Sequence, residues 1–139
     1  MSNIRIWLTE HDYTRLKHLV AQLARQSRGM QAGMETLEGI LESARVVNPA
    51  GVPENVVTMN SRVLFEDVLT REHGTVTVVY PANSDPAAGK ISVLSPVGAA
   101  LLGETEGREV ELPLPYGKTR RIRIIGVLYQ PEAQGEFAL

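Results

Sequence analysis

The first part of the chain alternates apolar and polar side chains, which predicts a short β-strand. Ile4, Ile6 and Leu8 recur at every second position, the period that places side chains on one face of a strand. Thr9 follows, and Asp12 stands three positions after it. This spacing suits a capping box, in which a hydroxyl accepts from an early helix amide and a carboxylate reaches back. We therefore expect the strand to end, and a helix to begin, near Thr9.

Two segments with apolar residues three and four positions apart predict a helical hairpin. Between them, the segment QSRGMQAG at 26–33 contains two glycines and a serine, which favour a turn. Pro49 and Gly51 are expected to end the second helix, because proline cannot continue a helix. The two helices should pack antiparallel as a short coiled coil. Their apolar positions are Tyr13, Leu16, Leu19, Val20 and Leu23 in the first helix and Met34, Leu37, Ile40, Leu41 and Ala44 in the second.

From about Val56 onward the chain is rich in β-branched residues, which predict strands. Gly126 follows the alternation of Ile122 and Ile124 with arginines and indicates a β-bulge where that alternation slips. Because parallel pairs of such short strands need crossover connections, we expect a mostly antiparallel sheet. The strand candidates span 56–67, 74–82, 90–95, 108–114 and 118–131.

One short helix is predicted inside this β-rich region, in the stretch ISVLSPVGAALLG at 91–103. Ser95 is suited to cap the helix and Pro96 to occupy its first turn, placements that both residue types favour. Gly103 is suited to end it. We expect this helix, over 96–102, to lie across one face of the sheet.

These elements predict an α+β fold in two parts. Residues 1–50 would hold the N-terminal strand and the helical hairpin, and residues 51–139 the β-rich domain. The stretch NPAGVPEN at 48–55 is the best candidate for a linker. A length of 139 residues fits one ordinary domain, or a small domain with an appendage.

Composition narrows the class of protein further. Apolar residues make up 43% of the chain and cysteine is absent, which excludes disulfides, thiolate metal sites and cysteine nucleophiles. No segment of the sequence is both long and uncharged enough to span a membrane. The N-terminal residues lack the apolar run of a secretory signal. We expect a cytoplasmic protein with no membrane partner.

The net charge of −2 argues against a general electrostatic binder of nucleic acid. Basic residues are nevertheless concentrated between Tyr13 and Met34, a segment without acidic residues. They are Arg15, Lys17, Arg25 and Arg28. Two interpretations stay open: these side chains form a solvated helix face, or they form a basic hairpin tip that meets a polyanion.

The residues give no catalytic constellation. His11 and His18 are seven positions apart, whereas metal ligands on a helix need a spacing of three or four, or a third partner nearby. The chain has no hydrolase elbow, phosphate loop or dinucleotide-binding motif. Glu104 and Glu106 follow the short helix and are expected to be solvated. We therefore expect no enzyme activity, no metal site and no cofactor.

Four stretches in order along the chain carry a resemblance to a known family. VVTMNSRVLFED, VVYPA, SPVGAALLG and YQPEAQGEFAL together resemble the Gre-type transcript elongation factors of bacteria. They are most similar to the subgroup called regulator of nucleoside diphosphate kinase, which has a shortened hairpin. The resemblance covers nearly the whole chain, and is strongest over 56–139.

This resemblance implies a fold, a partner and a binding site. The β domain of the family is similar to FK506-binding proteins, with a twisted antiparallel sheet and one short helix. The partner implied is RNA polymerase, and nucleic acid would be met only through it. In the family, the Ser-Pro corner grips a coiled coil of the polymerase at the mouth of its secondary channel. By that resemblance the docking residues would be Leu94, Ser95, Pro96 and Val97.

The hairpin tip departs from the pattern of the cleavage-stimulating members. Those proteins carry acidic residues on the tip into the polymerase active site, where carboxylates hold a metal ion and activate water. Here the tip reads LARQSRGMQAGM, with Arg25 and Arg28 and no acidic residue. The first helix, at about 9–26, would span only about 25 Å. We expect a polymerase-binding regulator that competes with Gre-type factors without stimulating cleavage, with both arginines near the channel rim.

Two other functions stay open on the sequence alone. The chain could be a protein-interaction module, or a regulator of nucleotide metabolism that does not act directly through polymerase. A prolyl isomerase is suggested by fold analogy only, which does not establish function. That activity needs an aromatic-lined pocket, and aromatic residues make up 5% of the chain. The oligomeric state is not determined by the sequence.

Overall fold

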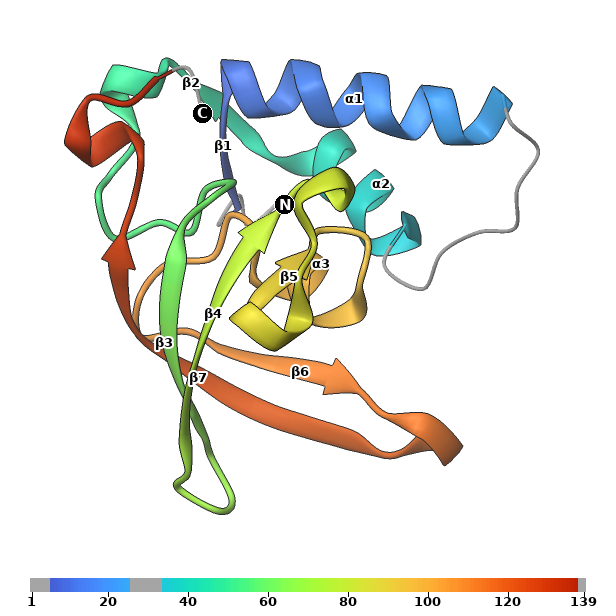
Figure 1. The fold of residues 1–139 in the computed structure, drawn as a ribbon, viewed down its shortest axis with the longest axis vertical. Coiled ribbons are helices and arrows are strands. Elements are labelled where there is room, and N and C mark those ends of the chain that lie inside the picture. Colours follow the sequence, from blue (N-terminus) through green and yellow to red (C-terminus); the bar gives the residue numbers. More distant parts are fainter. Residues whose placement is uncertain (1–5, 26–33, 138–139) are drawn as a thin grey trace.

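A curled five-stranded sheet with helices packed on one side organises the chain (Figure 1). The computed structural model describes residues 6–25 and 34–137, so the predictions made for Ile4 and Arg28 lie outside the described residues. The elements are β1 Trp7–Thr9, α1 Glu10–Arg25, α2 Met34–Ser43, β2 Arg45–Val47, β3 Arg62–Asp67, β4 His73–Val79, β5 Lys90–Ser92, α3 Pro96–Leu101, β6 Glu109–Pro113 and β7 Thr119–Tyr129. The predicted α+β class, a helical hairpin followed by a β-rich part, is confirmed.

The start of the first helix forms as predicted, but only one half of the capping box does. The hydroxyl of Thr9 accepts a hydrogen bond from the backbone N–H of Asp12 at 3.0 Å, which satisfies a helix-terminal donor. The Asp12 carboxylate does not reach back to Thr9. Instead it accepts from the backbone N–H of Met59 at 3.1 Å, so this side chain joins the helix to the β-rich part of the chain.

The two helices of the hairpin run antiparallel, as Figure 1 shows. The expectation that Pro49 and Gly51 end the second helix was wrong, because α2 already ends at Ser43. The next residues form β2, which pairs in parallel with β1 in the register Leu8↔Val46. β-branched side chains favour the extended backbone here, and Arg45 donates its backbone N–H to the carbonyl of Ile6 at 2.8 Å.

The main sheet has the strand order β5-β4-β3-β7-β6, and its pairs are antiparallel except for β4–β5. The parallel pair forms because residues 80–89 cross over through two 3-10 turns, Pro81–Asn83 and Pro86–Ala88. The strand predicted over 56–67 starts later than expected, at Arg62. Residues 56–61 are an irregular connection whose apolar side chains are buried.

Gly126 stands beside the predicted bulge. In the pairing of β3 with β7, Leu64 lies opposite Gly126 and Phe65 opposite Ile124, so Ile125 is left without a partner. A second shift leaves Leu128 unpaired in the same way. Such extra residues bend a strand and increase its twist.

One hydrophobic core joins the hairpin, α3 and the inner face of the sheet. Leu16, Leu37, Leu101, Ile122 and Ile124 have no exposed surface, and burying a side chain of this size contributes about 1.5–3 kcal/mol. The predicted placement of the short helix over the sheet is confirmed, because α3 contributes to this core. Within the described ranges, none of the helices has the length and apolar content required to cross a membrane.

Candidate functional site

The Ser-Pro corner is a rigid turn between β5 and α3. Ser95 caps α3: its hydroxyl accepts from the backbone N–H of Gly98 at 3.1 Å and donates to the carbonyl of Ser92 at 2.7 Å. Pro96 is the first residue of the helix, where its missing N–H costs no hydrogen bond. The hydroxyl of Ser92 accepts from the N–H of Leu94 at 3.0 Å. Both serines therefore fix the backbone of the corner.

Close packing of α3 on β5 explains why a glycine, Gly98, follows Ser-Pro at this spacing. A Cβ added to Gly98 would lie 2.2 Å from the carbonyl oxygen of Ser92, closer than any real Cβ contact. The first turn of α3 can therefore approach β5 only without a side chain at this position. Gly103 ends the helix at φ +79, and a Cβ there would lie 2.8 Å from the carbonyl oxygen of Trp7. The two glycines hold α3 tightly against strands on both sides.

The four residues predicted to dock a partner are contiguous, but they are not equally accessible. Leu94 is only 2% exposed and belongs to the hydrophobic core. Ser95, Pro96 and Val97 are partly exposed. Leu94 can therefore anchor the corner from inside, whereas a partner can touch the other three side chains.

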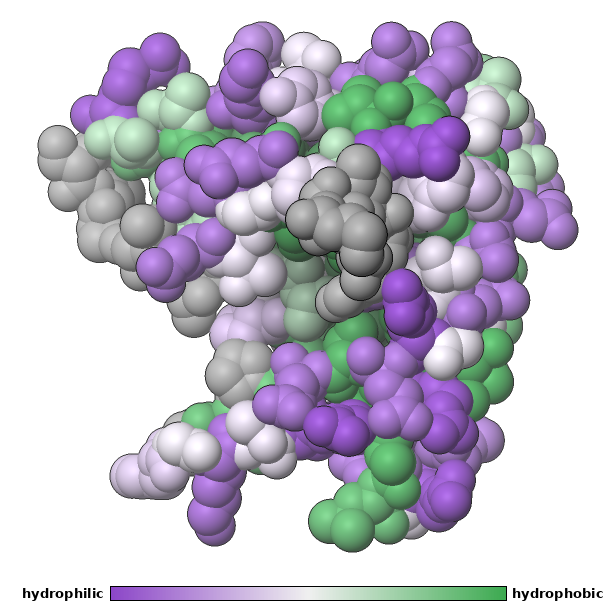
Figure 2. Space-filling model, turned by 180° about the vertical axis from the view of Figure 1, so that it is seen from behind, coloured by the Kyte–Doolittle hydropathy of each residue, from purple (hydrophilic) through white to green (hydrophobic). Residues whose placement is uncertain are grey.

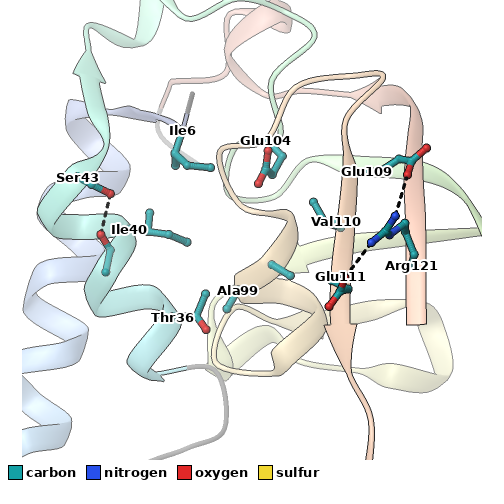
Figure 3. Close-up of a pocket in the computed structure, with 12 residues that line it drawn as sticks. Ile6, Thr36, Ile40, Ser43, Ala99, Glu104, Glu109, Val110, Glu111 and Arg121 are labelled. Atoms are coloured by element: carbon teal, nitrogen blue, oxygen red, sulfur yellow. Dashed lines mark hydrogen bonds and ion pairs between the residues drawn. The ribbon is translucent and has the colours of Figure 1, made fainter. Parts of the chain in front are cut away.

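A groove of about 790 Å³ lies behind α3, between α2 and the edge strand β6 (Figure 3). The view from behind in Figure 2 shows the molecule hollowed between its helical part and the β6–β7 arm. Ion pairs between β7 and β6 line one side of the groove. The Arg121 guanidinium donates to the Glu111 carboxylate at 2.9 Å and lies 3.9 Å from the Glu109 carboxylate. No aromatic side chain of the described residues lines the groove.

The expectation that Glu104 is exposed to solvent was wrong. Glu104 was expected to be solvated, like Glu106, but only 4% of it is exposed. Its backbone is tied on both sides: its N–H donates to Leu101 at 3.1 Å and its carbonyl accepts from Val57 at 2.9 Å. The chain that leaves α3 is thereby drawn into the protein. Glu106 is exposed, as expected.

The structure places only part of the predicted hairpin tip. Arg25 is the last residue of α1 and is exposed, at the end of the helix farthest from β1 in Figure 1. Arg28 lies outside the described residues. Within residues 6–25 and 34–137, no group of three His, Cys, Asp or Glu side chains is arranged to hold a metal ion.

A buried polar junction between α1 and the β-rich part was missed by the sequence reasoning. The Asp12 carboxylate accepts from the N–H of Met59 at 3.1 Å and from the hydroxyl of Tyr80 at 3.4 Å. Burial raises the pKa of Asp12 to about 7, and the nearby Glu132 carboxylate adds to this. Burial also raises the pKa of Tyr80, so this phenol stays protonated. The sequence does contain an indication of this junction. Asp12 stands four positions before Leu16 and so lies on the apolar face of the helix, where a carboxylate is unusual.

Comparison with known proteins gives concordant matches. Residues 52–129 match the family described as "Transcription elongation factor, GreA/GreB, C-term". A curated relative, "Regulator of nucleoside diphosphate kinase" of Escherichia coli (strain K12), is 36% identical over 142 aligned positions that cover 100% of both chains. The protein named "Transcription elongation factor GreA" in Oenococcus oeni is 35% identical over 98 positions, which cover 70% of this chain and 60% of that protein.

A solved structure is similar over most of the chain. It is titled "Prokaryotic transcription elongation factor GreA/GreB from Nitrosomonas europaea" and superposes with a TM-score of 0.75 at 41% sequence identity. The match covers 89% of this chain and 99% of that one. The similarity therefore extends over the helical hairpin as well as the β-rich part.

Proposed function

This chain belongs to the GreA/GreB transcription elongation factor family, and on that premise we propose that it regulates transcription by binding RNA polymerase. The observation that carries the proposal is the Ser-Pro corner. Ser95 closes it with two hydrogen bonds and Gly98 lets the helix pack directly on β5. A corner that is already rigid before binding loses little conformational entropy when a partner docks on it. Ser95, Pro96 and Val97 are its accessible residues, and Leu94 supports them from the core.

The same proposal excludes stimulation of transcript cleavage. A carboxylate is the natural ligand for the divalent ion that such chemistry requires, yet the segment between Tyr13 and Met34 contains none. The first helix has 16 residues, about 24 Å at 1.5 Å per residue. We infer that a hairpin with no carboxylate at its tip and with helices this short does not deliver a metal ligand to a distant active site.

We infer that the chain docks at the mouth of the secondary channel and competes there with Gre-type factors. The corner would hold the β-rich part, which we propose as a domain of residues 51–139, at the rim. The hairpin of residues 1–50 would then point toward the channel, with Arg25 and Arg28 near its rim. Docking without cleavage makes the protein a competitor of the cleaving members rather than a substitute for them.

Binding to core RNA polymerase tests this proposal. The parent protein is compared with a Ser95→Ala/Pro96→Ala variant and with a matched control, Asn48→Ala/Pro49→Ala. The control alters a second capped proline turn, in which the Asn48 side chain accepts from the N–H of Ala50 at 2.9 Å. We expect affinity to fall at least about tenfold, or 1.4 kcal/mol, for the first variant only. Equal affinities of folded variants, or equal losses, would contradict docking through the corner.

A second function is favoured by the name of one relative. That protein is called a regulator of nucleoside diphosphate kinase, so this chain could regulate nucleotide metabolism through a partner other than polymerase. The same experiment separates the two functions. If the parent protein fails to bind core polymerase at micromolar concentration, while it does bind a nucleoside diphosphate kinase, the second function replaces the first.

A further inference from the structure

The outer face of the main sheet carries a hollow lined by two cationic side chains. Its volume is about 500 Å³ and its lining includes Asn60, Arg62, Thr77, Asn83, Lys90 and Tyr129. A smaller hollow of about 300 Å³ shares Arg62 and Thr77 with it. None of these residues belongs to the Ser-Pro corner or to the groove behind α3, so the docking proposal does not account for them.

Strand pairing brings the polar residues into one row. Tyr129 on β7 pairs with Arg62 on β3, Arg62 pairs with Thr77 on β4, and Thr77 pairs with Lys90 on β5. Directly paired residues project from the same face of a sheet. Val63 and Val78, the next residues on β3 and β4, are fully buried, so the row lies on the opposite, outer face. Adjacent strands are about 4.8 Å apart, which separates the backbones of Arg62 and Lys90 by about 10 Å.

The two cations have no partner among the described residues. Neither the guanidinium of Arg62 nor the ammonium of Lys90 makes an ion pair, a hydrogen bond or a ring contact with residues 6–25 or 34–137. The arginines of the neighbouring strand β7 differ. Arg120 pairs with Asp67 at 2.7 Å, and Arg121 and Arg123 pair with glutamates of β6 at 2.9 and 2.6 Å. All three arginines of β7 are therefore paired with carboxylates, whereas Arg62 and Lys90 at the hollow are not.

Acidic residues lie at both ends of the row, but among the described residues none forms an ion pair with Arg62 or Lys90. Asp85 lies opposite Lys90 in a backbone bridge, but its carboxylate makes no ion pair with the Lys90 ammonium. Glu136 accepts a hydrogen bond from the hydroxyl of Tyr129. This bond raises the pKa of Tyr129 to about 12, so the phenol is neutral and adds no negative charge to the hollow.

The neutral lining residues add further hydrogen-bond donors. The side-chain amides of Asn60 and Asn83 and the hydroxyl of Thr77 form no side-chain hydrogen bond with any described residue. Asn60 is held in a left-handed turn at φ 68, where its N–H donates to the carbonyl of Val78 at 2.6 Å. The hollow thus combines two free cations with neutral donors on a fixed backbone, a combination that suits the oxygens of a phosphoryl group.

We propose that this hollow binds a phosphate-bearing small molecule of nucleotide size, with its phosphoryl groups between Arg62 and Lys90. Guanidinium and ammonium groups about 10 Å apart at the backbone can close from two sides on adjacent phosphoryl groups, because both side chains are long and flexible. The volume lies within the range of about 300–1,000 Å³ that small-molecule sites occupy. The ring of Tyr129 supplies an apolar wall. This proposal is independent of polymerase binding.

Titration of the full-length, isotope-labelled protein tests the proposal. The probes are ADP, inorganic pyrophosphate and adenosine, added at about 0.15 M salt so that exposed charges are screened. The variant is Arg62→Gln/Lys90→Gln. The matched control is Arg108→Gln/Lys118→Gln, which removes the same charge from two exposed cations outside the hollow.

We expect ADP and pyrophosphate to shift the amide signals of residues 60–62, 77–79 and 90, and adenosine to have little effect. The affinity for ADP should fall at least about tenfold in the Arg62/Lys90 variant and stay unchanged in the control. Three results would each overturn the proposal: no shifts at millimolar ADP, equal losses in both variants, or adenosine binding as tightly as ADP. Preferential binding of an acidic peptide at the same residues would overturn it too.

Discussion

The carboxylate of Asp12, on the first turn of α1, accepts a hydrogen bond from the backbone N–H of Met59, 47 residues further along the chain. Tyr80 adds a second hydrogen bond at 3.4 Å, and the Arg15 guanidinium lies 4.4 Å from the centre of the Tyr80 ring. The hairpin is therefore attached to the β-rich part by a buried polar group as well as by apolar packing. An attachment of this kind fixes the direction in which the hairpin leaves the sheet.

Stability should depend on pH through Asp12. Burial raises its pKa from 3.8 in the unfolded chain to about 7 in the folded protein. Between these values the folded state holds a proton that the unfolded state has lost, so stability falls as pH rises from about 4 to about 7 and then levels off. Asp12→Asn removes this slope. We expect the stabilities of the two proteins to diverge across this window by on the order of 2–4 kcal/mol.

Urea unfolding of both proteins at pH 5, 6, 7 and 8 measures that divergence. Titratable groups far from Asp12 are common to the two proteins and cancel in the difference, whereas the electrostatic influence of Glu132 and Arg15 on Asp12 is part of what is measured. Parallel stability curves over the whole range would show that Asp12 is ionised in the folded protein throughout, contrary to this account.

Two helical glycines should respond in opposite ways to substitution by alanine. At Gly98 the new Cβ would lie 2.2 Å from the carbonyl oxygen of Ser92, whereas at Gly39 in α2 nothing lies within 4 Å. We expect Gly98→Ala to lower the free energy of unfolding by at least about 2 kcal/mol. Gly39→Ala should raise it by about 0.5–1 kcal/mol, because alanine favours the helix. Thermal unfolding of both variants decides this, and a harmless Gly98→Ala would refute the close approach of α3 to β5.

The basic hairpin tip should contribute to polymerase binding through exposed charge. We expect Arg25→Glu/Arg28→Glu to weaken binding to core polymerase at low salt, and the difference from the parent to shrink as salt is added, because exposed charges are screened over about 10 Å at 0.1 M. Arg108→Glu/Lys118→Glu is the charge-matched control. If the tip variant binds with unchanged affinity at low salt, the arginines do not contribute to polymerase binding, and the interpretation as a solvated surface is favoured.

Local rules in the sequence predicted much of the fold. Ser95, Pro96 and Gly103 mark the ends of α3 because capping and helix termination depend on neighbouring residues alone. The buried alternation of Ile122 and Ile124, and the bulge beside Gly126, follow from the period of a strand. The antiparallel hairpin is likewise visible in the spacing of its apolar residues.

Features that depend on pairing between distant segments could not be predicted in this way. β2 exists because Val46 lies beside Leu8, and nothing near Val46 in the sequence indicates that partner. The row from Arg62 to Lys90 likewise needs the register of three strands. The sequence predicted a local cap for Asp12, because only its close neighbours in the chain could be considered. In the structure its carboxylate accepts from the N–H of Met59, which is far away in the sequence.

Competition in a transcript-cleavage assay tests the central claim most directly. Stalled elongation complexes are incubated with a fixed amount of a cleavage-stimulating Gre-type factor and increasing amounts of this protein or its Ser95→Ala/Pro96→Ala variant. We predict that the parent protein alone releases no RNA fragment, that it suppresses cleavage by the Gre-type factor, and that excess factor restores cleavage. The variant should suppress cleavage at least about tenfold less effectively. Cleavage by this protein alone, or failure of the folded parent to suppress cleavage at saturating concentration, would contradict the account.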